Sequence, residues 1–357
     1  MREKKKKNNK SKGNLVVLFT ILFLICGFLV YFGKAGTLFK KAKTNIPKPV
    51  PEVKKLKIVD EDSNSRPIAV MINNNHDAWP HAGLQDAYLN YEIIVEGGIT
   101  RIMSLFKDKD TSKIGSVRSS RHYYLDYVLE NDAIYVHFGY SDQAASDIKS
   151  LDINNINGLV DSTAFWRDTT LKKAYEHTAF TSMEKINNLI TNKGYRTTTD
   201  KGLLLNYTTD EVDLSKHEGS QKCDSIEIEY SNYQTTSYEY DSEKKVYLRS
   251  MSNNKHVDAI TGEQYTAKNI ITYQVNNRTI DSYGRQDLDN IGSGTGYYIT
   301  NGYAVPITWE KSSRSGKTVY KYSNGKEINV SDGNTWIQIQ PKGKNLQITG
   351  AEEIVDE

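Results

Sequence analysis

The sequence predicts an α/β (mixed) N-terminal domain and an all-β C-terminal domain, with a single N-terminal transmembrane helix ahead of both. The first observation is that residues 15–32 are apolar and carry no charge. The second is that short apolar runs alternate with helical spacings between residues 66 and 201, as in mixed α/β domains. The third is a change, from about residue 224, to alternating apolar and polar residues with turn dipeptides between them.

The charge of the chain is unevenly distributed. The 357 residues carry a net charge of +2, but residues 1–13 contribute +6 and residues 34–57 contribute +7. Residues 58–357 are therefore acidic, with a net charge of −11. A general nucleic-acid binder needs a basic surface, so this balance argues against that class of protein. The length is sufficient for two domains with separate cores.

The apolar segment is expected to be a membrane anchor at residues 14–33, behind a basic cytoplasmic tail at residues 1–13. Its uncharged stretch would form a helix about 27 Å long, close to the thickness of bilayer hydrocarbon. A cleaved signal peptide would have a shorter apolar region and a small-residue cleavage site. Lipidation of Cys26 would need a small residue before it, whereas Ile25 precedes it, so a retained helix is favoured. The seven basic residues before the segment, against five after it, favour an extracytoplasmic position for the rest of the chain.

The other boundaries follow from composition. The chain has only two cysteines, Cys26 in the apolar segment and Cys223, so no intrachain disulfide is expected and Cys223 is interpreted as a structural thiol. Alternating prolines favour an extended linker after the anchor. We expect this linker at residues 34–57, the α/β domain at 58–201, a connector at 202–223, the all-β domain at 224–345 and an acidic tail at 346–357.

Within the α/β domain, the apolar spacing of residues 121–130 predicts a helix. Thr181-Ser-Met-Glu184 has the pattern of a capping box ahead of a second helix, which is expected to end at Gly194. Four short apolar runs predict buried strands, at residues 68–72, 91–95, 102–106 and 133–138.

Within the all-β domain, alternating residues predict strands at 226–230, 237–240 and 245–249. Gly292-Ser-Gly-Thr-Gly296 is not followed by a helical pattern, so we expect a glycine-rich bend between strands rather than a phosphate-binding loop. Three dipeptides favour type I′ hairpin turns, namely Asn301-Gly302, Asn324-Gly325 and Asp332-Gly333.

The stretch KIGSVRSSR, residues 113–121, is unusual because lysine supplies most of the positive charge elsewhere. Only 11 of the 46 basic residues are arginine, yet Arg101, Arg118 and Arg121 fall within 21 positions. Ser119 and Ser120 are expected where a short strand turns into a helix, where serine can cap free N–H groups and the helix dipole attracts anions. The planar guanidinium group suits phosphate or carboxylate.

These residues predict an oxyanion-binding site. A histidine at the end of a predicted strand is included because ligand sites of open α/β sheets gather there. An arginine from the stretch Phe165-Trp-Arg-Asp168 is included because this stretch could form an aromatic platform for a sugar. The candidate ligand-binding residues are Arg101, Arg118, Ser119, Ser120, Arg121, Glu96, His137 and Arg167.

The alternative interpretation is structural. In it, the arginines form ion pairs with Glu92, Glu96 or Asp126 that only hold the fold, and the aromatic residues of 165–168 are core. His137 and the other histidines would likewise be hydrogen-bonded structural side chains.

No motif indicates catalysis. The sequence has no Gly-x-Ser-x-Gly elbow, no Ser-x-x-Lys with a later Lys-Thr-Gly, and no metal-binding signature such as His-Glu-x-x-His. We therefore assign no catalytic residue, no metal ligand and no cofactor.

Several blocks, in order, resemble the YerB-type lipoprotein family of Gram-positive bacteria. They are RPIAVMIN from residue 66, VEGGITR from 95, KIGSVRSSR from 113, DAIYVH from 132 and GNTW from 333. The resemblance covers residues 66–345 and implies paired N- and C-terminal domains of unknown function in an exported, membrane-attached envelope protein. It implies no established activity. The chain departs from the family in the residue before Cys26 and in His177-Thr178, where the family tends to have His-Asn.

A fainter likeness concerns the arginines. An arginine at a strand start, a charged hairpin at residues 107–110 and Arg-x-x-Arg entering a helix are similar to the LytR–CpsA–Psr phosphotransferases. Those enzymes hold a polyprenyl-linked pyrophosphate with arginines and a divalent metal. Glu96 and Asp126 are the nearby carboxylates here.

The sequence thus predicts a membrane-anchored, extracytoplasmic, non-catalytic cell-envelope protein. Its partner would be an anionic or glycan-linked wall component or a wall-synthesis protein, and not nucleic acid. Two alternatives remain: a phosphotransferase-like enzyme acting on polyprenyl-pyrophosphate-linked glycan with a divalent metal, and a pure protein–protein scaffold. An enzyme predicts a pocket where arginines meet carboxylates, and a scaffold predicts an exposed apolar patch on the β domain.

Overall fold

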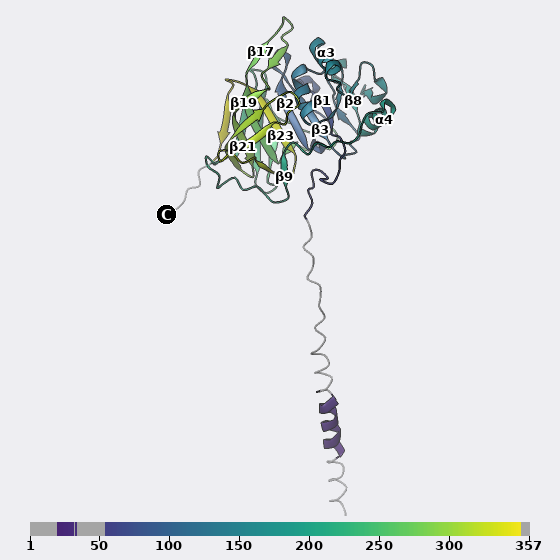
Figure 1. Cartoon of the computed structure of the whole chain (residues 1–357), viewed down its shortest axis with the longest axis vertical. Coiled ribbons are helices and arrows are strands. Elements are labelled where there is room, and N and C mark those ends of the chain that lie inside the picture. The colour runs from purple at the N-terminus through teal and green to yellow at the C-terminus, as the bar shows by residue number, and fades with distance from the viewer. Residues whose placement is uncertain (1–19, 32, 34–53, 351–357) are drawn as a thin grey trace, which may run out of the picture. The chain divides into compact units, whose positions relative to one another are not determined.

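The computed structural model describes residues 20–31, 33 and 54–350 (Figure 1). The chain divides into two units, Met1–Val53 and Lys54–Glu357. Residues 20–31 and 33 are helical, and no helix among the described residues is long and apolar enough to cross a membrane. The expected tail at residues 1–13 lies outside the described residues, as do residues 14–19 and 32 of the expected anchor. Residues 34–53 of the expected linker and 351–357 of the expected acidic tail also lie outside them.

The second unit is built on an eleven-stranded sheet that crosses it from β19 to β1 in Figure 1. The pairing order is β10 (Gln221–Lys222), β20 (Tyr303–Lys311), β19 (Gly292–Thr300), β16 (Asn269–Val275), β23 (Thr335–Pro341), β2 (Leu89–Ile94), β3 (Thr100–Phe106), β1 (Ile68–Asn74), β5 (Ile134–His137) and β6 (Asn155–Asn157), with β21 (Val319–Tyr322) paired to β20.

A second sheet of six strands packs against the first. Its order is β14 (Asn254–Lys255), β13 (Val246–Met251), β12 (Thr235–Asp241), β11 (Ser225–Glu229) and β24 (Leu346–Thr349), with β15 (Thr266–Ala267) paired to β13. Three small sheets pair β17 (Asn277–Thr279) with β18 (Gln286–Leu288), β22 (Asn329–Ser331) with β9 (Asn206–Thr208), and β4 (Ile114–Gly115) with β8 (Ala179–Thr181) and β7 (Phe165–Arg167).

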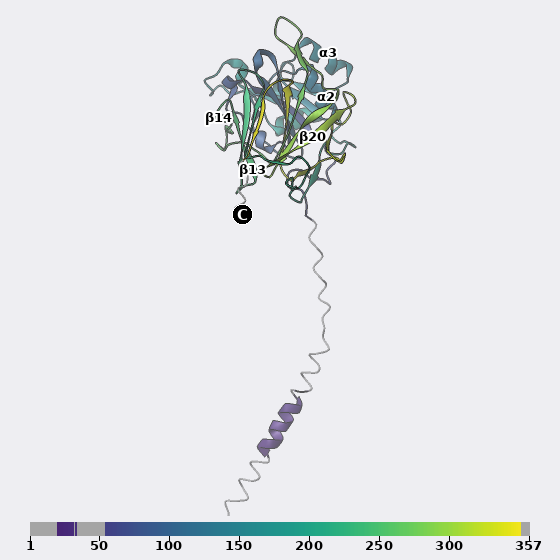
Figure 2. The same ribbon diagram turned by 90° about the vertical axis from the view of Figure 1, so that its left-hand side faces the viewer.

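The helices of this unit are short. The α-helices are α2 (Leu125–Glu130), α3 (Asp142–Ser150) and α4 (Met183–Lys193). The 3₁₀ helices are η1 (His76–Ala78), η2 (Leu84–Asp86), η3 (Glu96–Gly98), η4 (His122–Tyr124), η5 (Ser162–Ala164) and η6 (Tyr175–His177). Figure 2 shows β13 and β14 on the left of this unit and α2 and α3 on its right.

The two domains expected from the sequence share the main sheet. Strand β2, from the expected α/β segment, pairs in parallel with β23, from the expected all-β segment. Leu89 lies opposite Thr335 and Ile93 lies opposite Ile339. The expected connector at 202–223 contributes β9 and β10. The change of sequence pattern near residue 224 therefore marks a change from mixed to strand-rich structure, but the hydrogen-bonded sheet continues across it.

Most of the expected elements are confirmed. Strands β1, β2, β3 and β5 cover the four apolar runs, and the six-stranded sheet contains the three alternating runs as β11, β12 and β13. The second helix, α4, ends at Gly194, which has the left-handed φ of 64°. Its N-cap is Ser182, not Thr181, because the hydroxyl of Thr181 donates to the carbonyl oxygen of Ala164 instead.

The three turn dipeptides behave differently. Asn301-Gly302 joins β19 to β20 with φ of 50° and 78°, as a type I′ turn requires. At Asn324-Gly325 only the glycine has positive φ, so that turn is of another type. The hairpin prediction at Asp332-Gly333 is wrong, because β22 and β23 do not pair with each other. The Asp332 carboxylate instead accepts hydrogen bonds from the backbone N–H groups of residues 57 and 58.

The glycine-rich stretch 292–296 is also not a bend. It forms the first half of β19 and pairs along its length with β20. A Cβ atom at Gly296 would lie 2.2 Å from the carbonyl oxygen of Thr272 on β16. Glycine at this position therefore allows the two strands to approach each other.

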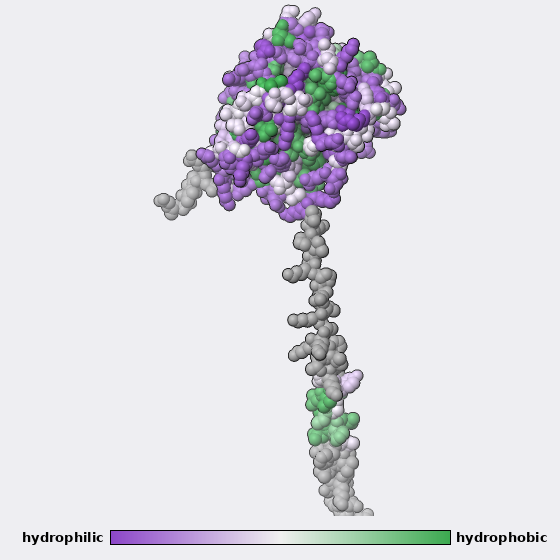
Figure 3. Space-filling view, viewed as in Figure 1, coloured by the Kyte–Doolittle hydropathy of each residue, from purple (hydrophilic) through white to green (hydrophobic). Residues whose placement is uncertain are grey.

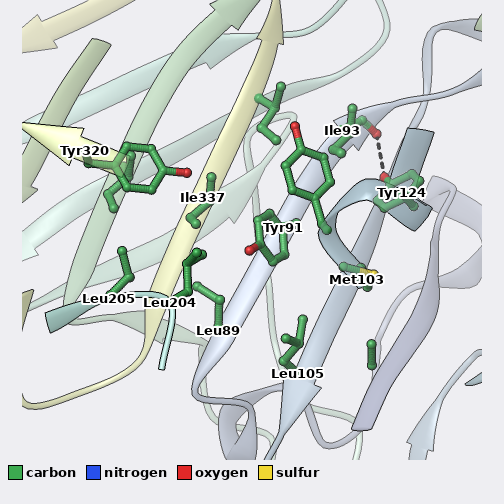
Figure 4. Packing of buried hydrophobic residues seen from close by; sticks show 14 of the residues in the cluster. Leu89, Tyr91, Ile93, Met103, Leu105, Tyr124, Leu204, Leu205, Tyr320 and Ile337 are labelled. Atoms are coloured by element: carbon green, nitrogen blue, oxygen red, sulfur yellow. Dashed lines mark hydrogen bonds between the residues drawn. The ribbon is translucent and has the colours of Figure 1, made fainter. Parts of the chain in front are cut away.

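The main sheet is buried on both faces, which explains its nearly continuous apolar runs. Leu89, Tyr91 and Ile93 of β2 point into one core together with Ile337 of β23, as Figure 4 shows. In the same view, the hydroxyl of Tyr124 donates to the carbonyl oxygen of Ile93 over 3.0 Å. The opposite face packs against the six-stranded sheet and α4, through residues that include Ile226, Tyr238 and Ile186.

A buried polar network joins the two sheets. Glu92 on β2 and Arg249 on β13 are fully buried, and Arg249 Nη2 lies 2.6 Å from Glu92 Oε2. Arg249 also donates to Nδ1 of His256, whose Nε2 lies 2.6 Å from Nδ1 of His81. His81 Nε2 lies 2.6 Å from the carbonyl oxygen of Asn73. Because arginine only donates and a carbonyl only accepts, each histidine accepts at Nδ1 and donates from Nε2, and both are neutral.

This neutral pair predicts a loss of stability in mild acid. Burial lowers the pKa of His81 to about 3, and burial together with the charge of Arg249 lowers the pKa of His256 well below its ordinary value. In the unfolded chain both groups titrate near 6.5, so the unfolded state takes up protons first as the pH falls. Stability is therefore complete well above pH 6.5 and falls below it, by about 2 kcal/mol for His81 alone between pH 8 and pH 5. Urea unfolding at a series of pH values measures this loss.

Two variants make the test specific. His81→Gln can still donate to Asn73 and accept from His256. It should reduce the loss of stability between pH 8 and pH 5 by the contribution of His81, about 2 kcal/mol. His217→Gln, at a partly exposed histidine, should leave it unchanged. A free energy of unfolding that stays constant from pH 8 to pH 5 in the unmodified chain would contradict a neutral buried pair.

Candidate functional site

We call Arg101, Arg118, Arg121 and Arg167 the arginine cluster. Glu96 is the carboxylate that pairs with two of them, Arg101 and Arg121. It follows β2 in the turn η3, where Gly97 and Gly98 have φ of 69° and 75°. A Cβ atom at Gly98 would lie 2.9 Å from the hydroxyl of Ser231, so the turn needs glycine there. The chain then enters β3, which begins with Thr100 and Arg101.

Two arginines of the cluster are held by Glu96. Arg121 donates from Nε and Nη2 to the two carboxylate oxygens, with Nη2 2.9 Å from Oε2. Arg101 Nη2 lies 3.8 Å from the same Oε2, and Nη1 of Arg101 donates to the carbonyl oxygen of Ser119. Burial alone would raise the pKa of Glu96, but the two guanidinium groups lower it overall. Burial lowers the pKa of Arg101 to about 10. For these two residues the structural interpretation is therefore correct in part, because Glu96 is their partner.

Arg118 differs from both. Its backbone N–H donates to the carbonyl oxygen of Met71 on β1, and its carbonyl oxygen accepts from the N–H of Phe138 after β5. These bonds fix its backbone between two strands of the main sheet. Its partly exposed guanidinium group has no hydrogen bond and no ion pair with any residue in the described part of the chain. Burial lowers the pKa of Arg118, Glu176 opposes this, and the charges of Arg121 and Arg167 lower it further.

Arg167 is packed between two aromatic rings. Its guanidinium carbon lies 4.4 Å from the ring centre of Phe138 and 3.9 Å from that of Tyr175, and Nη1 donates to the carbonyl oxygen of Tyr175. The neighbouring Asp168 pairs with Lys113 at 2.7 Å and not with Arg167. Arg167 stacks on Phe138, whose backbone N–H donates to the carbonyl oxygen of Arg118, so the structure places it beside the other arginines.

The expected helix-capping role of Ser119 and Ser120 is wrong, while ligand binding by their hydroxyl groups stays a prediction. The hydroxyl of Ser119 donates to the carbonyl oxygen of Phe138, and the hydroxyl of Ser120 is buried next to that of Tyr135. The N-cap of η4 is Arg121, and no side chain caps it. The backbone of Ser120 instead bridges to Tyr140, so the chain stays extended through both serines. Neither serine caps a helix, and α2, with six residues, is too short to supply the expected dipole.

His137 is structural in the described fold. It is fully buried, Nδ1 lies 2.8 Å from the carbonyl oxygen of Gly139, and Nε2 lies 3.1 Å from Oδ1 of Asn155. Its ring also stacks on Tyr135, with the ring centres 4.9 Å apart. Burial lowers the pKa of His137, and its hydrogen bonds to Gly139 and Asn155 oppose this shift.

Near Arg118 lie Asn73 and His177, neither of which is among the candidate ligand-binding residues. Asn73, at the end of β1, lies 2.8 Å from Nδ1 of His177 through its side-chain nitrogen. Burial lowers the pKa of His177, and after Glu176 the charge of Arg118 is the next influence on it. Asn73 and His177 are 104 positions apart, so no local sequence pattern signals their contact. Buried near them is the hydroxyl of Ser116, which has no partner in the described residues.

This arrangement can bind an anion. Arg101 and Arg121 are already oriented by Glu96, while Arg118 keeps a free hydrogen-bonding fork. Residues 20–31, 33 and 54–350 contain no group of three or more His, Cys, Asp or Glu side chains placed to hold a metal ion. Asp126, the second carboxylate proposed for metal binding, is paired with Arg314 at 2.6 Å.

Comparison with known proteins identifies the family. The family described as "Protein of unknown function (DUF3048)" matches through its N-terminal domain at residues 55–196 and its C-terminal domain at residues 226–337. A protein of Bacillus subtilis (strain 168) described as "Putative lipoprotein YerB" is 30% identical over 290 residues, covering 80% of this chain and 84% of that protein. The crystal structure of the YerB protein from Bacillus subtilis matches with a TM-score of 0.71 and 27% identity, covering 83% of this chain and all of that one. The chain therefore belongs to the DUF3048 family, together with YerB of Bacillus subtilis.

Proposed function

We propose that this protein is a membrane-attached, extracytoplasmic envelope protein that binds an anionic group, phosphate or carboxylate, of a cell-wall component at Arg118. The relative from Bacillus subtilis is described as a "putative lipoprotein", which supports attachment of this chain to the outer face of the membrane. The uncharged segment at residues 15–32, flanked by basic residues, supports the same location. The proposal assigns binding only, without a catalytic residue.

The observation that carries the proposal is the unpaired guanidinium group of Arg118. A half-buried guanidinium group normally has a carboxylate or carbonyl partner, because burial of a charge without one is costly. Arg101 and Arg121 have such partners, and Arg118 lies beside them without one. An oxyanion at this position would accept two parallel N–H bonds from the planar fork of Arg118. The positive charges of Arg121 and Arg167 would add to the attraction.

Replacement of Arg118 by Gln should abolish most of this binding without affecting the fold. Titration calorimetry with inorganic pyrophosphate and with a glycerol-phosphate oligomer should show affinity falling by a factor of about 10 or more, since a hydrogen bond to a charged group contributes about 1.5–3 kcal/mol. The free energy of unfolding should change by less than about 0.5 kcal/mol, because the side chain has no partner to lose.

Arg285→Gln is the matched control, because Arg285 is also partly exposed but pairs with Asp281 and Asp142. It should leave anion binding unchanged. If Arg118→Gln binds both probes as tightly as the unmodified chain, Arg118 is not the ligand contact and the proposal fails. If the same variant unfolds, Arg118 serves the fold rather than a ligand.

A protein–protein scaffold is the second candidate, favoured by exposed apolar side chains in the strand-rich part. Tyr283 is 79% exposed and Ile280 43% exposed, both in the hairpin of β17 and β18, which projects at the top of Figure 1. Figure 3 shows a mainly hydrophilic surface interrupted by apolar patches. A scaffold that uses this hairpin would keep its partner when Arg118 is replaced by Gln, whereas wall binding would be lost. The phosphotransferase alternative remains a prediction.

A further inference from the structure

A polar cleft lies beside η4 and α2, and no part of the proposed function uses it. Its volume is 670 Å³, within the range of small-ligand sites. Its wall combines both sequence halves: the η4–α2 and α3 segments contribute His122, Asp126 and Asp147, and the strand-rich half contributes Asn290, the start of β19 and Trp309. We call it the β19 cleft.

Each carboxylate in the wall of the β19 cleft is paired with a guanidinium group, although the four carboxylates outnumber the two guanidinium groups and Lys342 together. Arg314 is shared by Asp126, at 2.6 Å, and Asp147, at 2.9 Å. Arg278 is shared in the same way by Asp287 and Asp289. An anion entering the cleft would meet these carboxylates, and a cation would meet the guanidinium groups. A neutral ligand that is rich in hydrogen-bonding groups avoids both penalties.

Two buried polar atoms of the wall have no partner among the described residues. They are Nε1 of Trp309 and Oδ1 of Asn290, and these two residues are only 4% and 3% exposed. The orientation of the Asn290 amide is fixed, because its Nδ2 donates to the carbonyl oxygen of Tyr123 at 2.9 Å and to Asp126 at 3.3 Å. Its oxygen therefore needs a donor, while the Trp309 indole needs an acceptor. Leaving a buried donor or acceptor unpaired costs about 1–3 kcal/mol.

The glycine-rich half of β19 makes room for the indole. Gly294 lies opposite Trp309 in the strand pair, and a Cβ atom there would lie 2.7 Å from Nε1. Any other residue would displace the indole from the wall of the cleft. The neighbouring Ser293 is exposed and also lines the cleft, so its side chain is at the rim.

We propose that the β19 cleft binds a neutral carbohydrate, one or two sugar rings of a glycan. A sugar hydroxyl or acetamido group both donates and accepts, so a single ring can satisfy the indole N–H and the Asn290 oxygen once the groups that cover these two buried atoms move aside. The paired carboxylates and guanidinium groups supply further fixed hydrogen-bond partners for hydroxyl groups. This site is separate from Arg118 and does not depend on the anion-binding proposal.

The test follows the indole N–H of Trp309 by NMR in the full chain. Trp309→Phe identifies the resonance, since the chain has four tryptophans. Titration with the tetramer of β-1,4-linked N-acetylglucosamine or with maltotetraose should shift this resonance saturably. Trp309→Phe removes the donor but keeps an aromatic ring, and titration calorimetry of this variant should show binding about tenfold weaker, as expected for one lost hydrogen bond.

Ser293→Trp should close the rim and abolish binding, whereas Ser242→Trp, at an exposed serine outside the cleft, should leave it intact. Arg118→Gln should also leave sugar binding intact, which separates this proposal from the anion site. The proposal is overturned if neither sugar shifts the resonance, if Ser293→Trp binds as well as the unmodified chain, or if a polar tetrapeptide binds at least as tightly.

Discussion

Replacement of Glu92 by Gln is expected to destabilise the protein by about 3–5 kcal/mol, because it leaves the Arg249 cation buried without a counter-charge. Both side chains are fully shielded from solvent. Glutamine would also turn one carboxylate oxygen into an NH₂ group facing the guanidinium donors of Arg249. A loss of this size is a large part of the stability of an ordinary domain.

Both oxygens of the Glu92 carboxylate already accept hydrogen bonds from other side chains. Its Oε1 accepts from the side chains of Asn74 and Thr100, at 3.1 and 2.7 Å, and the hydroxyl of Thr236 lies 3.0–3.1 Å from both oxygens. The Arg249 guanidinium group is also stacked over the ring of Trp336, 4.4 Å from its centre, so it cannot rotate toward another partner without losing that contact.

Urea unfolding of a double-mutant cycle measures the effect. Arg249→Met alone should also be strongly destabilising, and the double variant Glu92→Gln/Arg249→Met should recover part of the loss, since no unpaired charge remains. Glu229→Gln is the control, because Glu229 pairs with Lys344 at a partly exposed position and its loss should cost less than about 1 kcal/mol. A cost below about 1 kcal/mol for Glu92→Gln would show that the pair is not buried as described.

The sequence predicts local elements well and their partners poorly. Strands β1, β3 and β5 are evident because both of their faces are buried, so they read as continuous apolar runs. Helix α4 is evident from its periodicity and from Gly194. The pairing of β2 with β23 joins residues about 245 positions apart, and nothing in the sequence of either strand identifies the other as its partner.

The same limit applies to the candidate site. The sequence grouped Arg101, Arg118 and Arg121, and the fold brings them to the same end of β1: Arg101 lies opposite Asn73, and Val117, next to Arg118, bridges Ile72. Which of them is paired could not be predicted, since that depends on the position of the Glu96 carboxylate after the turn is folded. The serine caps failed because the following helix starts at Leu125, later than its apolar spacing suggests.

The C-terminal boundary of the α/β segment provides the second prediction with a large effect. Residues 54–201 expressed alone are not expected to fold cooperatively, although a separate family domain matches residues 55–196. In this fragment β2 would lose β23 and become an exposed edge, and its apolar face would lose Ile337 and Tyr320. Glu92 would lose Arg249 as well, leaving its carboxylate without a cation at the sheet interface.

Circular dichroism in the near ultraviolet and urea titration of three products test this. The chain from residue 54 to 350 should give one cooperative transition, while fragments 54–201 and 202–350 should each lack fixed aromatic signals. Mixing the two fragments should restore part of the near-ultraviolet signal, because the parallel pairing of β2 with β23 and the Glu92–Arg249 pair form again only when both are present. If fragment 54–201 unfolds cooperatively with a midpoint close to that of the longer chain, the shared sheet is not what stabilises the first half. In that case the two halves are independently stable, and the shared sheet is only the interface through which they dock.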